Sequence, residues 1–305
     1  MLTDLIALQD HYPVAIPAMA FLLGSVIGSF LNVVVYRLPS SMMHEWHGQA
    51  IEIIEEISNN SAVSRQLRET IENADEPPSL IRPGSRCPHC HSSIKPWHNI
   101  PIISWVLLRG NCHQCQRPIS LRYPIVELAT ALLTVIVIAN FGVSWQGLAA
   151  CCFTWAMIAL ALIDFDTQLL PDNITLPFIW LGLIANYFDL FVDLNAAFLG
   201  AIAGYLTLWI VYQLFKLTTG KEGMGFGDFK MLAMLGAWLG VAAIPLIIFI
   251  SSFAGALFGC ILILSGGSKD NPLKFGPFLA IAGWIALMWG EQLFDWYLEL
   301  AFRHV

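Results

Sequence analysis

The sequence predicts an all-α polytopic membrane protein with about eight transmembrane helices and one cysteine-containing loop domain. Three observations support this fold class. First, 57% of the 305 residues are hydrophobic, whereas an average soluble domain has about 45–50% apolar residues. Second, the charged residues are unevenly spread and leave several long windows without any charge. Third, the longest polar segment contains two Cys-x-x-Cys pairs, so it is expected to fold outside the membrane.

The uncharged windows in the first half of the chain define three expected helices. A helix that crosses about 30 Å of hydrocarbon needs about 20 residues, because it rises about 1.5 Å per residue. Residues 11–36 contain no Asp, Glu, Lys or Arg and give the first span. Residues 128–163 are about twice as long as one crossing and contain a break signal at residues 140–144. This window therefore predicts two helices.

The second half of the chain supplies five more expected spans. Residues 173–188 and residues 194–215 give one each. Residues 231–268 are too long for one helix and must form two, with the turn expected near Ser251-Ser252. Residues 275–290 give the last span. The total is eight, and the short windows make seven the alternative.

The basic residues predict the orientation of these spans. Nine of the 15 Lys and Arg residues lie between residues 37 and 123, and a topology with eight spans in all would leave only Arg303 on the opposite side. Because Lys and Arg accumulate on the cytoplasmic side, we expect this segment to be cytoplasmic and both termini to lie outside. The N-terminus carries Asp4 and Asp10 where a signal peptide has a basic region, which argues against a cleaved signal.

The chain is therefore expected to divide into three parts. Residues 1–36 form a first transmembrane segment, residues 37–123 a cytoplasmic loop and residues 124–305 a transmembrane core. The nine basic residues of the loop face eight acids, and no basic patch with interleaved aromatic residues is present. We therefore expect the lipid bilayer, and no nucleic acid, among the partners of the protein.

The two cysteine pairs of the loop have the spacing of a structural zinc site. Each pair can occupy one edge of a tetrahedron, and the 21 residues between them can bring the two edges together. Thiols in the cytoplasm stay reduced, which disfavours disulfides. We predict a zinc ion bound by Cys87, Cys90, Cys112 and Cys115, which stabilises a loop too small to bury much core.

A membrane redox protein is the competing interpretation of these cysteines. A thioredoxin-type dithiol should open a helix after a strand, but here a second pair follows instead. The nearby His89, His91 and His113 are alternative ligands that we expect to be bystanders. The remaining cysteines lie inside apolar spans and are expected to be small packing residues; they are Cys151, Cys152 and Cys260.

A glycine-rich loop and the end of the third span bring acids to one predicted membrane face. The loop, residues 223–228, has three alternating glycines and ends in Asp228. Glycine lets a chain turn tightly and lets another backbone approach closely. The third span ends in Asp164, followed by Asp166 and Asp172. Both ends are cytoplasmic in the predicted topology.

Two carboxylates at the same membrane face are suited to aspartic-protease chemistry. In a poorly hydrated site they cannot both ionise cheaply, so they share a proton. The ionised partner activates water, and the protonated partner donates to the developing oxyanion. Asp164, Asp166 and Asp172 all remain candidates, although Asp164 adjoins the apolar span and should be the most desolvated. The alternatives are a loop of solvated acids and a proton- or cation-coupled transporter using Asp164 and Asp228.

Several motifs occur together along most of the chain, from about Pro17 to Trp289. They are residues 28–39 (GSFLNVVVYRLP), the two cysteine pairs, residues 122–124 with 126–128, Ile163-Asp164 with Leu170-Pro171-Asp172, residues 225–230, and residues 275–277. This combination resembles the bacterial prepilin peptidases, or type IV prepilin leader peptidase/N-methyltransferases, which are membrane aspartic proteases of the GxGD type. Gly-x-Gly-Asp alone would also suit intramembrane proteases of the presenilin type.

The resemblance implies an activity and assigns residues to it. Asp164 and Asp228 would be the catalytic pair, with Asp166 and Asp172 supporting them, and residues 124–305 would be the aspartic peptidase core. Such enzymes lie in the bacterial inner membrane. At its cytoplasmic face they remove the basic leader from type IV prepilins and type II secretion pseudopilins, after a glycine. They then methylate the new N-terminus from S-adenosylmethionine.

Only the resemblance supports the methyl transfer. The glycines at residues 223–227 lie between membrane helices and lack the strand-loop-helix context of a Rossmann site, so the methyl-donor residues are unknown. We expect the zinc loop and Glu127 to lie near that site, and Gly110 to be required for backbone clearance. Placement of Glu127 at the interface beside Arg122 is the alternative.

Overall fold

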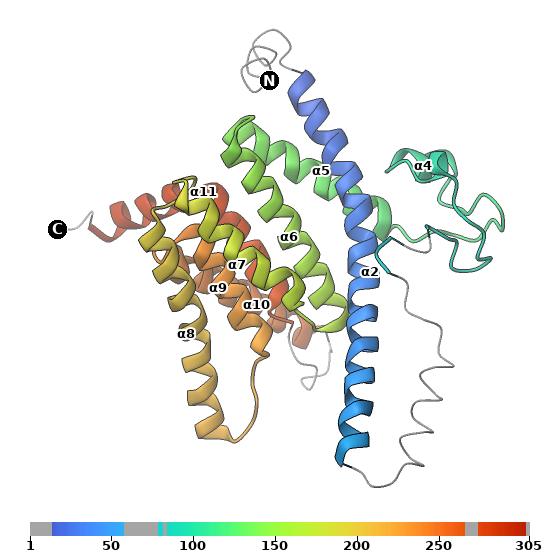
Figure 1. Cartoon of the computed structure of the whole chain (residues 1–305). Coiled ribbons are helices and arrows are strands. Elements are labelled where there is room, and N and C mark those ends of the chain that lie inside the picture. The colour runs from blue at the N-terminus through green and yellow to red at the C-terminus, as the bar shows by residue number, and fades with distance from the viewer. Residues whose placement is uncertain (1–13, 58–78, 82–83, 266–273, 303–305) are drawn as a thin grey trace. The chain divides into compact units, whose positions relative to one another are not determined.

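The computed structural model describes residues 14–57, 79–81, 84–265 and 274–302. Within these ranges the regular secondary structure is helical apart from two isolated β-bridges, which confirms the predicted all-α class (Figure 1). The helices are α2 (Ala15–Ile57), η1 (Pro96–His98), α4 (Ile103–Leu107), α5 (Arg122–Phe141), α6 (Trp145–Thr167), α7 (Asp172–Tyr187), α8 (Leu194–Thr219), α9 (Phe226–Leu239), α10 (Ala243–Leu264) and α11 (Gly276–Phe302).

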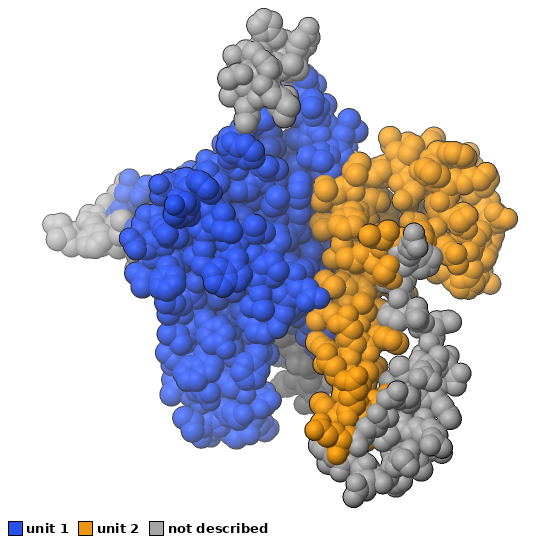
Figure 2. All heavy atoms as spheres, in the orientation of Figure 1, with its two compact units in different colours: residues 1–24, 130–305 blue, residues 25–129 orange. Residues whose placement is uncertain are grey.

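The chain forms two compact units (Figure 2). The first unit, which is orange and labelled unit 2 in Figure 2, comprises residues 25–129 and contains most of α2, both cysteine pairs and the start of α5. The second unit, which is blue and labelled unit 1 there, comprises residues 1–24 and 130–305 and contains helices α6 to α11. The two cysteine pairs and the two aspartates of the predicted site therefore belong to different units.

The long helices correspond to the apolar windows of the sequence. Six helices in the described ranges are long and apolar enough to cross a membrane: α2, α5, α6, α8, α10 and α11. Helix α7 has 16 residues and α9 has 14, so each is too short to cross about 30 Å of hydrocarbon alone. The described helices thus agree with eight apolar segments, but only six of them qualify as spans.

The two turns expected inside long windows have different outcomes. The break at residues 140–144 is confirmed, because α5 ends at Phe141 and α6 begins at Trp145. The turn expected near Ser251-Ser252 is wrong. The chain turns at Gly240, whose φ of 79° is readily adopted by glycine, and α10 then runs through both serines. Inside α10, Ser251 is buried and its hydroxyl donates to the carbonyl of Ile248.

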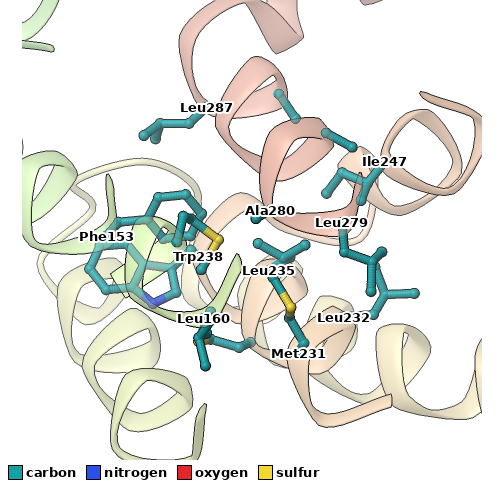
Figure 3. Packing of buried hydrophobic residues seen from close by; sticks show 14 of the residues in the cluster. Phe153, Leu160, Met231, Leu232, Leu235, Trp238, Ile247, Leu279, Ala280 and Leu287 are labelled. Atoms are coloured by element: carbon teal, nitrogen blue, oxygen red, sulfur yellow. The ribbon is translucent and has the colours of Figure 1, made fainter. Parts of the chain in front are cut away.

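Helix α9 forms the centre of the second unit. Every residue from Met231 to Trp238 is buried, as expected for a helix that is apolar on all sides. The surrounding cluster draws on α6, α8, α10 and α11 as well. Figure 3 shows members of this cluster around α9: Phe153, Leu160, Ile247, Leu279, Ala280 and Leu287.

Two glycines let α9 and α8 approach to backbone contact. A Cβ atom added at Gly236 of α9 would lie 2.1 Å from the carbonyl oxygen of Gly200. A Cβ atom added at Gly200 of α8 would lie 2.3 Å from the carbonyl oxygen of Gly236. A side chain at either position would force the two helices apart. Close packing of this kind is what small residues allow between membrane helices.

Polar side chains fix the two ends of α9. Near its C-terminus, the buried Asn186 amide donates to the carbonyls of Ala237 and Trp238 at 2.9 and 3.0 Å. Near its N-terminus, Nζ of Lys230 lies 2.7 Å from both carboxylate oxygens of Asp172 at the start of α7. These contacts determine where the first turn of α9 lies relative to α7.

Candidate active site

Asp228 lies in the first turn of α9 and is buried, with 9% of its surface exposed. The glycine-rich loop leads directly into this turn, and the backbone N–H of Asp228 donates to the carbonyl of Gly225 at 3.3 Å. Gly227 is needed for close approach, because a Cβ atom there would lie 2.7 Å from Cβ of Leu170. The loop therefore places the acid inside the helix assembly instead of exposing it to water.

Asp164 lies in the last turn of α6 and is 6% exposed. Its Oδ2 atom accepts a hydrogen bond of 3.0 Å from the backbone N–H of Gly276, at the start of α11. Nearby, Nζ of Lys274 donates to the carbonyl of Phe165. The first residue of α11 thus holds the Asp164 carboxylate, and Lys274 just before the helix holds the backbone beside it. The sequence contained residues 275–277 as a motif, but nothing in their pattern indicated this contact.

The two buried acids lie close enough to interact electrostatically. The negative charge of Asp164 acts on Asp228, so the carboxylates are within range of direct electrostatic interaction. They come from different helices, α6 and α9, and are separated in sequence by the whole of α7 and α8. Like charges in a buried site cannot both ionise cheaply, so the arrangement favours a shared proton.

The structure distinguishes Asp164 from the two acids that the sequence left as alternatives. Asp166 is exposed. Asp172 forms the ion pair with Lys230 and is about half exposed at its side chain. Among these three acids, only Asp164 is buried and interacts with Asp228. Burial therefore agrees with the expectation that Asp164 is the most desolvated.

The four cysteines of the first unit form a cluster that can hold a metal ion. The sulfur atoms of Cys87, Cys90, Cys112 and Cys115 all lie within 4.8 Å of one another. The Cys87 and Cys115 sulfurs are 3.8 Å apart. Four sulfurs at about 2.3 Å from a tetrahedral zinc ion would be about 3.8 Å apart. The four thiols therefore fit the predicted ligand set.

The two arms of the cluster, residues 86–93 and 111–118, have the same pattern of backbone hydrogen bonds. His91 and Gln116 donate their N–H groups to the carbonyls of Cys87 and Cys112, four residues earlier. Both donors have positive φ, 56° and 57°. Each arm is closed by an isolated bridge, Arg86 to Ser93 and Asn111 to Pro118. Neither cysteine pair opens a helix after a strand, so the local structure lacks the context of a thioredoxin-type dithiol.

The thiols of the cluster differ in acidity. The Ser92 side chain and backbone lower the pKa of Cys90 to about 6, which favours the thiolate that a metal requires. Despite a backbone hydrogen bond at Arg117, burial and the neighbouring thiols raise the pKa of Cys115 to about 11. The neighbouring histidines make other contacts. His89 lies 3.3 Å from a guanidinium nitrogen of Arg117, and the His113 ring lies against His98. No histidine belongs to the metal-binding group found in the described ranges.

Comparison with known proteins decides the family. Residues 22–141 match the model of the bacterial peptidase A24 N-terminal domain, and residues 151–260 match that of the type IV leader peptidase family. The chain is 50% identical over 290 residues to the prepilin leader peptidase/N-methyltransferase of Stutzerimonas stutzeri, covering 95% of this chain and 96% of the relative. The chain belongs to the type IV leader peptidase family.

Other members of the type IV leader peptidase family are similarly close. The Pseudomonas aeruginosa protein of the same name is 49% identical over 291 residues, with 95% and 96% of the two chains covered. The one from Aeromonas salmonicida is 47% identical over 299 residues, with 98% and 99% covered. None of these names describes a transporter. No solved structure matches the chain significantly.

In this leader peptidase, Glu127 is buried in the first unit, with 8% of its surface exposed. Its Oε2 atom accepts a hydrogen bond of 2.7 Å from the backbone N–H of Ile102. Arg122 at the start of the same helix is exposed. The structure therefore buries Glu127 beneath the loop that carries Ile102, and its placement relative to the membrane interface stays a prediction.

Gly110 also has the backbone role expected for it. Its φ is 70°, and a Cβ atom there would lie 2.8 Å from the Trp105 ring. Its N–H donates to the carbonyl of Trp105, and its own carbonyl accepts from Ile119. Gly110 therefore leaves room for Trp105 immediately before the second cysteine pair of this family member.

Proposed function

We propose that this protein is an aspartic endopeptidase that removes the basic leader peptide from type IV prepilins and type II secretion pseudopilins. The observation that carries the proposal is the pair of buried, electrostatically interacting acids, Asp164 and Asp228. Both lie within residues 151–260, which match the type IV leader peptidase family. The names of the relatives supply prepilins as substrates, and the resemblance described above adds the pseudopilins.

The pair can perform peptide hydrolysis with one shared proton. The ionised aspartate takes a proton from water, and the water oxygen attacks the carbonyl carbon of the scissile bond. The protonated aspartate donates to the developing oxyanion, and a proton then passes to the leaving amine. Gly276 contributes by binding Oδ2 of Asp164, which orients the carboxylate and leaves Oδ1 for water or the shared proton.

The proposal includes where the reaction takes place. The excess of Lys and Arg in residues 37–123 supports a cytoplasmic loop. Helices α5 and α6 both qualify as spans, so crossing the membrane twice would return the chain to the side of this loop at the end of α6, where Asp164 lies. Asp228 at the start of α9 would lie on the same side, because it interacts with Asp164. We therefore assign the site to the cytoplasmic face of the bacterial inner membrane, with residues 124–305 as the peptidase core.

We also propose that the protein methylates the amino terminus that cleavage creates, as the names of its relatives suggest. S-adenosylmethionine would supply the methyl group. A zinc ion on Cys87, Cys90, Cys112 and Cys115 would cross-link the two arms of the loop and supply folding free energy. We assign this zinc a structural role, because four cysteine ligands leave no open coordination position for a substrate.

One experiment tests both proposed activities. A prepilin is incubated with the full-length protein, with and without S-adenosylmethionine, and the products are identified by mass spectrometry. We expect cleavage after a glycine in both reactions. The added mass of one methyl group should appear at the new N-terminus only when the donor is present. An intact prepilin in both reactions would refute the peptidase assignment.

Substitution of Gly276 tests how Asp164 is positioned. A Cβ atom at this residue would lie 2.7 Å from Oδ2 of Asp164, so Gly276→Ala should displace the carboxylate. We expect the cleavage rate to fall by about 10²-fold, since a displacement of about 1 Å can have this effect. Initial rates at equal protein amounts measure the change. Gly290→Ala is the control, because Gly290 lies beyond the kink of α11 at Trp289 and a Cβ atom there meets nothing within 4 Å. Equal rates for both variants would contradict the positioning role.

A further inference from the structure

Glu127 is a buried acid that the peptidase mechanism does not use. Among the described side chains of the first unit, it is the one acid that is buried; Glu45, Glu52 and Glu56 are exposed. A buried carboxylate is costly unless something compensates its charge. Inside a membrane protein such a residue is a functional candidate, and its partner should be sought.

The polar contacts of Glu127 in the described chain come from neutral donors. The backbone N–H of Ile102 donates to Oε2 at 2.7 Å, and the hydroxyl of Ser29 on α2 makes a second hydrogen bond. Neither donor carries a positive charge. The carboxylate is therefore oriented, but its charge is not neutralised by these two groups.

The backbone around this carboxylate is held in an unusual conformation. Ile102 has φ 60° and ψ −54°, which is an outlier for a β-branched residue. Such conformations persist when the surroundings determine them, and they gather at functional sites. A second contact joins α2 to α5: the side-chain amide of Asn32 donates to the carbonyl of Tyr123, one turn before Glu127. Ser29 and Asn32 are one turn apart on α2, so both contacts lie along the same pair of helices.

The sequence also separates Glu127 from the proteolytic pair. Glu127, Ser29 and Asn32 lie within residues 22–141, the part that matches the N-terminal domain model. Asp164 and Asp228 lie within residues 151–260, the part that matches the leader peptidase model. The relatives are named for two activities, peptidase and N-methyltransferase. The motifs that contain Ser29, Asn32 and Glu127 thus lie outside the part that matches the peptidase model, and they are candidates for the N-methyltransferase activity.

We propose that Glu127 binds the α-ammonium group of the cleaved pilin and accepts its proton during methyl transfer. This inference rests on the proposed methyltransferase function. A primary ammonium has the charge that the site lacks, and it offers three donors to the carboxylate oxygens. An ammonium nitrogen has no lone pair, so it must lose a proton before it can attack a methyl group.

The proposed reaction is one proton transfer followed by the exchange of one bond to the methyl carbon for another. A proton passes from the α-ammonium to the Glu127 carboxylate. The nitrogen lone pair then forms a bond to the methyl carbon of the sulfonium donor. The carbon–sulfur bond breaks with its electron pair on sulfur, which becomes a neutral thioether. The proton on Glu127 is later released to water, which restores the carboxylate.

The test uses Glu127→Gln, which keeps the shape and an oxygen acceptor for Ile102 but removes the charge. In the full-length protein we expect cleavage to stay within about twofold of wild type and methylation to fall by about 10²-fold or more, the usual contribution of a proton acceptor. Mass spectrometry of the product reports both. Glu52→Gln, an exposed acid of the same unit, is the matched control and should behave as wild type. Zinc content should be unchanged in both variants.

A binding measurement without the methyl donor separates this role from a purely structural one. The ligands are a synthetic peptide of the mature pilin N-terminus with a free α-amine and the same peptide N-acetylated. We expect wild type and Glu127→Asp to prefer the free amine, and Glu127→Gln to lose that preference. Normal methylation by Glu127→Gln, or equal binding of both peptides by wild type, would overturn the proposal.

Two further outcomes separate failure of the proposed role of Glu127 from failure of the proposed methyltransferase function. If Glu127→Gln retains zinc but loses cleavage as well as methylation, Glu127 is not specific to methyl transfer and the proposal is wrong. If wild type cleaves the prepilin but never methylates it, the proposed methyltransferase function fails, and the role of Glu127 fails with it while the peptidase assignment stands.

Discussion

Replacing either Asp164 or Asp228 with asparagine is expected to abolish prepilin cleavage while the protein still accumulates in the membrane. Asparagine keeps the size of the side chain but can neither accept a proton from water nor share one with its partner. Positioned acids and bases contribute about 10²–10⁴-fold each, so the loss should reach at least about 10²-fold. The measurement is the fraction of prepilin cleaved by membranes that contain equal amounts of each variant.

The double variant sharpens this test. Because the two acids are proposed to act as one unit, removing both should cost little more than removing either one. Additive losses would instead indicate two independent contributions. Asp189→Asn is a suitable control, since Asp189 is exposed and its φ of 51° is one that asparagine also tolerates. Full activity of Asp164→Asn or Asp228→Asn would exclude that residue from the catalytic pair.

Cys87→Ser and Cys112→Ser are each expected to remove zinc from the purified protein. Wild type should carry about one ion per chain, held by four thiolates at about 2.3 Å. Serine is a poor zinc ligand, and each substitution breaks one arm of a cluster whose arms have little other core. Structural zinc contributes about 10–16 kcal/mol in small zinc-binding peptides, so the loop should also lose its protease resistance. Elemental analysis and limited proteolysis measure the two effects.

The control for the metal site is Cys260→Ser. Cys260 is an exposed residue of α10, outside the cluster. The zinc content of the Cys260→Ser variant should therefore equal that of wild type. Unchanged zinc in Cys87→Ser or Cys112→Ser would refute the ligand assignment. Reversible formation of a disulfide between the cluster cysteines, without bound zinc, would instead favour the redox interpretation.

The ends of the helices were predictable where the limits of the uncharged windows and the turn-forming residues indicate the same boundary. Residues 128–163 contain the Asn140-to-Ser144 break, and the structure has a positive φ at Gly142 followed by the Ser144 cap of α6. The turn between α9 and α10 was misplaced, because dividing the window in half favoured the serines over Gly240. Serine hydroxyls can be satisfied inside an apolar helix by the preceding turn, as Ser251 shows. Gly240 was the stronger signal.

The site was predictable only in part, for a physical reason. Burial of Asp164 followed from its position beside an apolar span, and the metal cluster followed from spacing. The contacts from Gly276 to Asp164 and from Ile102 to Glu127 join residues 112 and 25 apart in sequence. Both are made by backbone N–H groups, which every residue except proline has, so no residue type marks them in a sequence.

The shortness of α9 bears on how the protein is assembled in the membrane. A helix of 14 residues is about 21 Å long and cannot insert stably as a span of its own. Its stability comes from backbone contact with α8 and from burial among neighbouring helices, and Asp228 lies in its first turn. The donor to Asp164, Gly276, starts the last helix. A nascent chain that has inserted only as far as α9 would therefore contain both aspartates without a finished site, so proteolytic competence should appear only once α11 has joined the assembly.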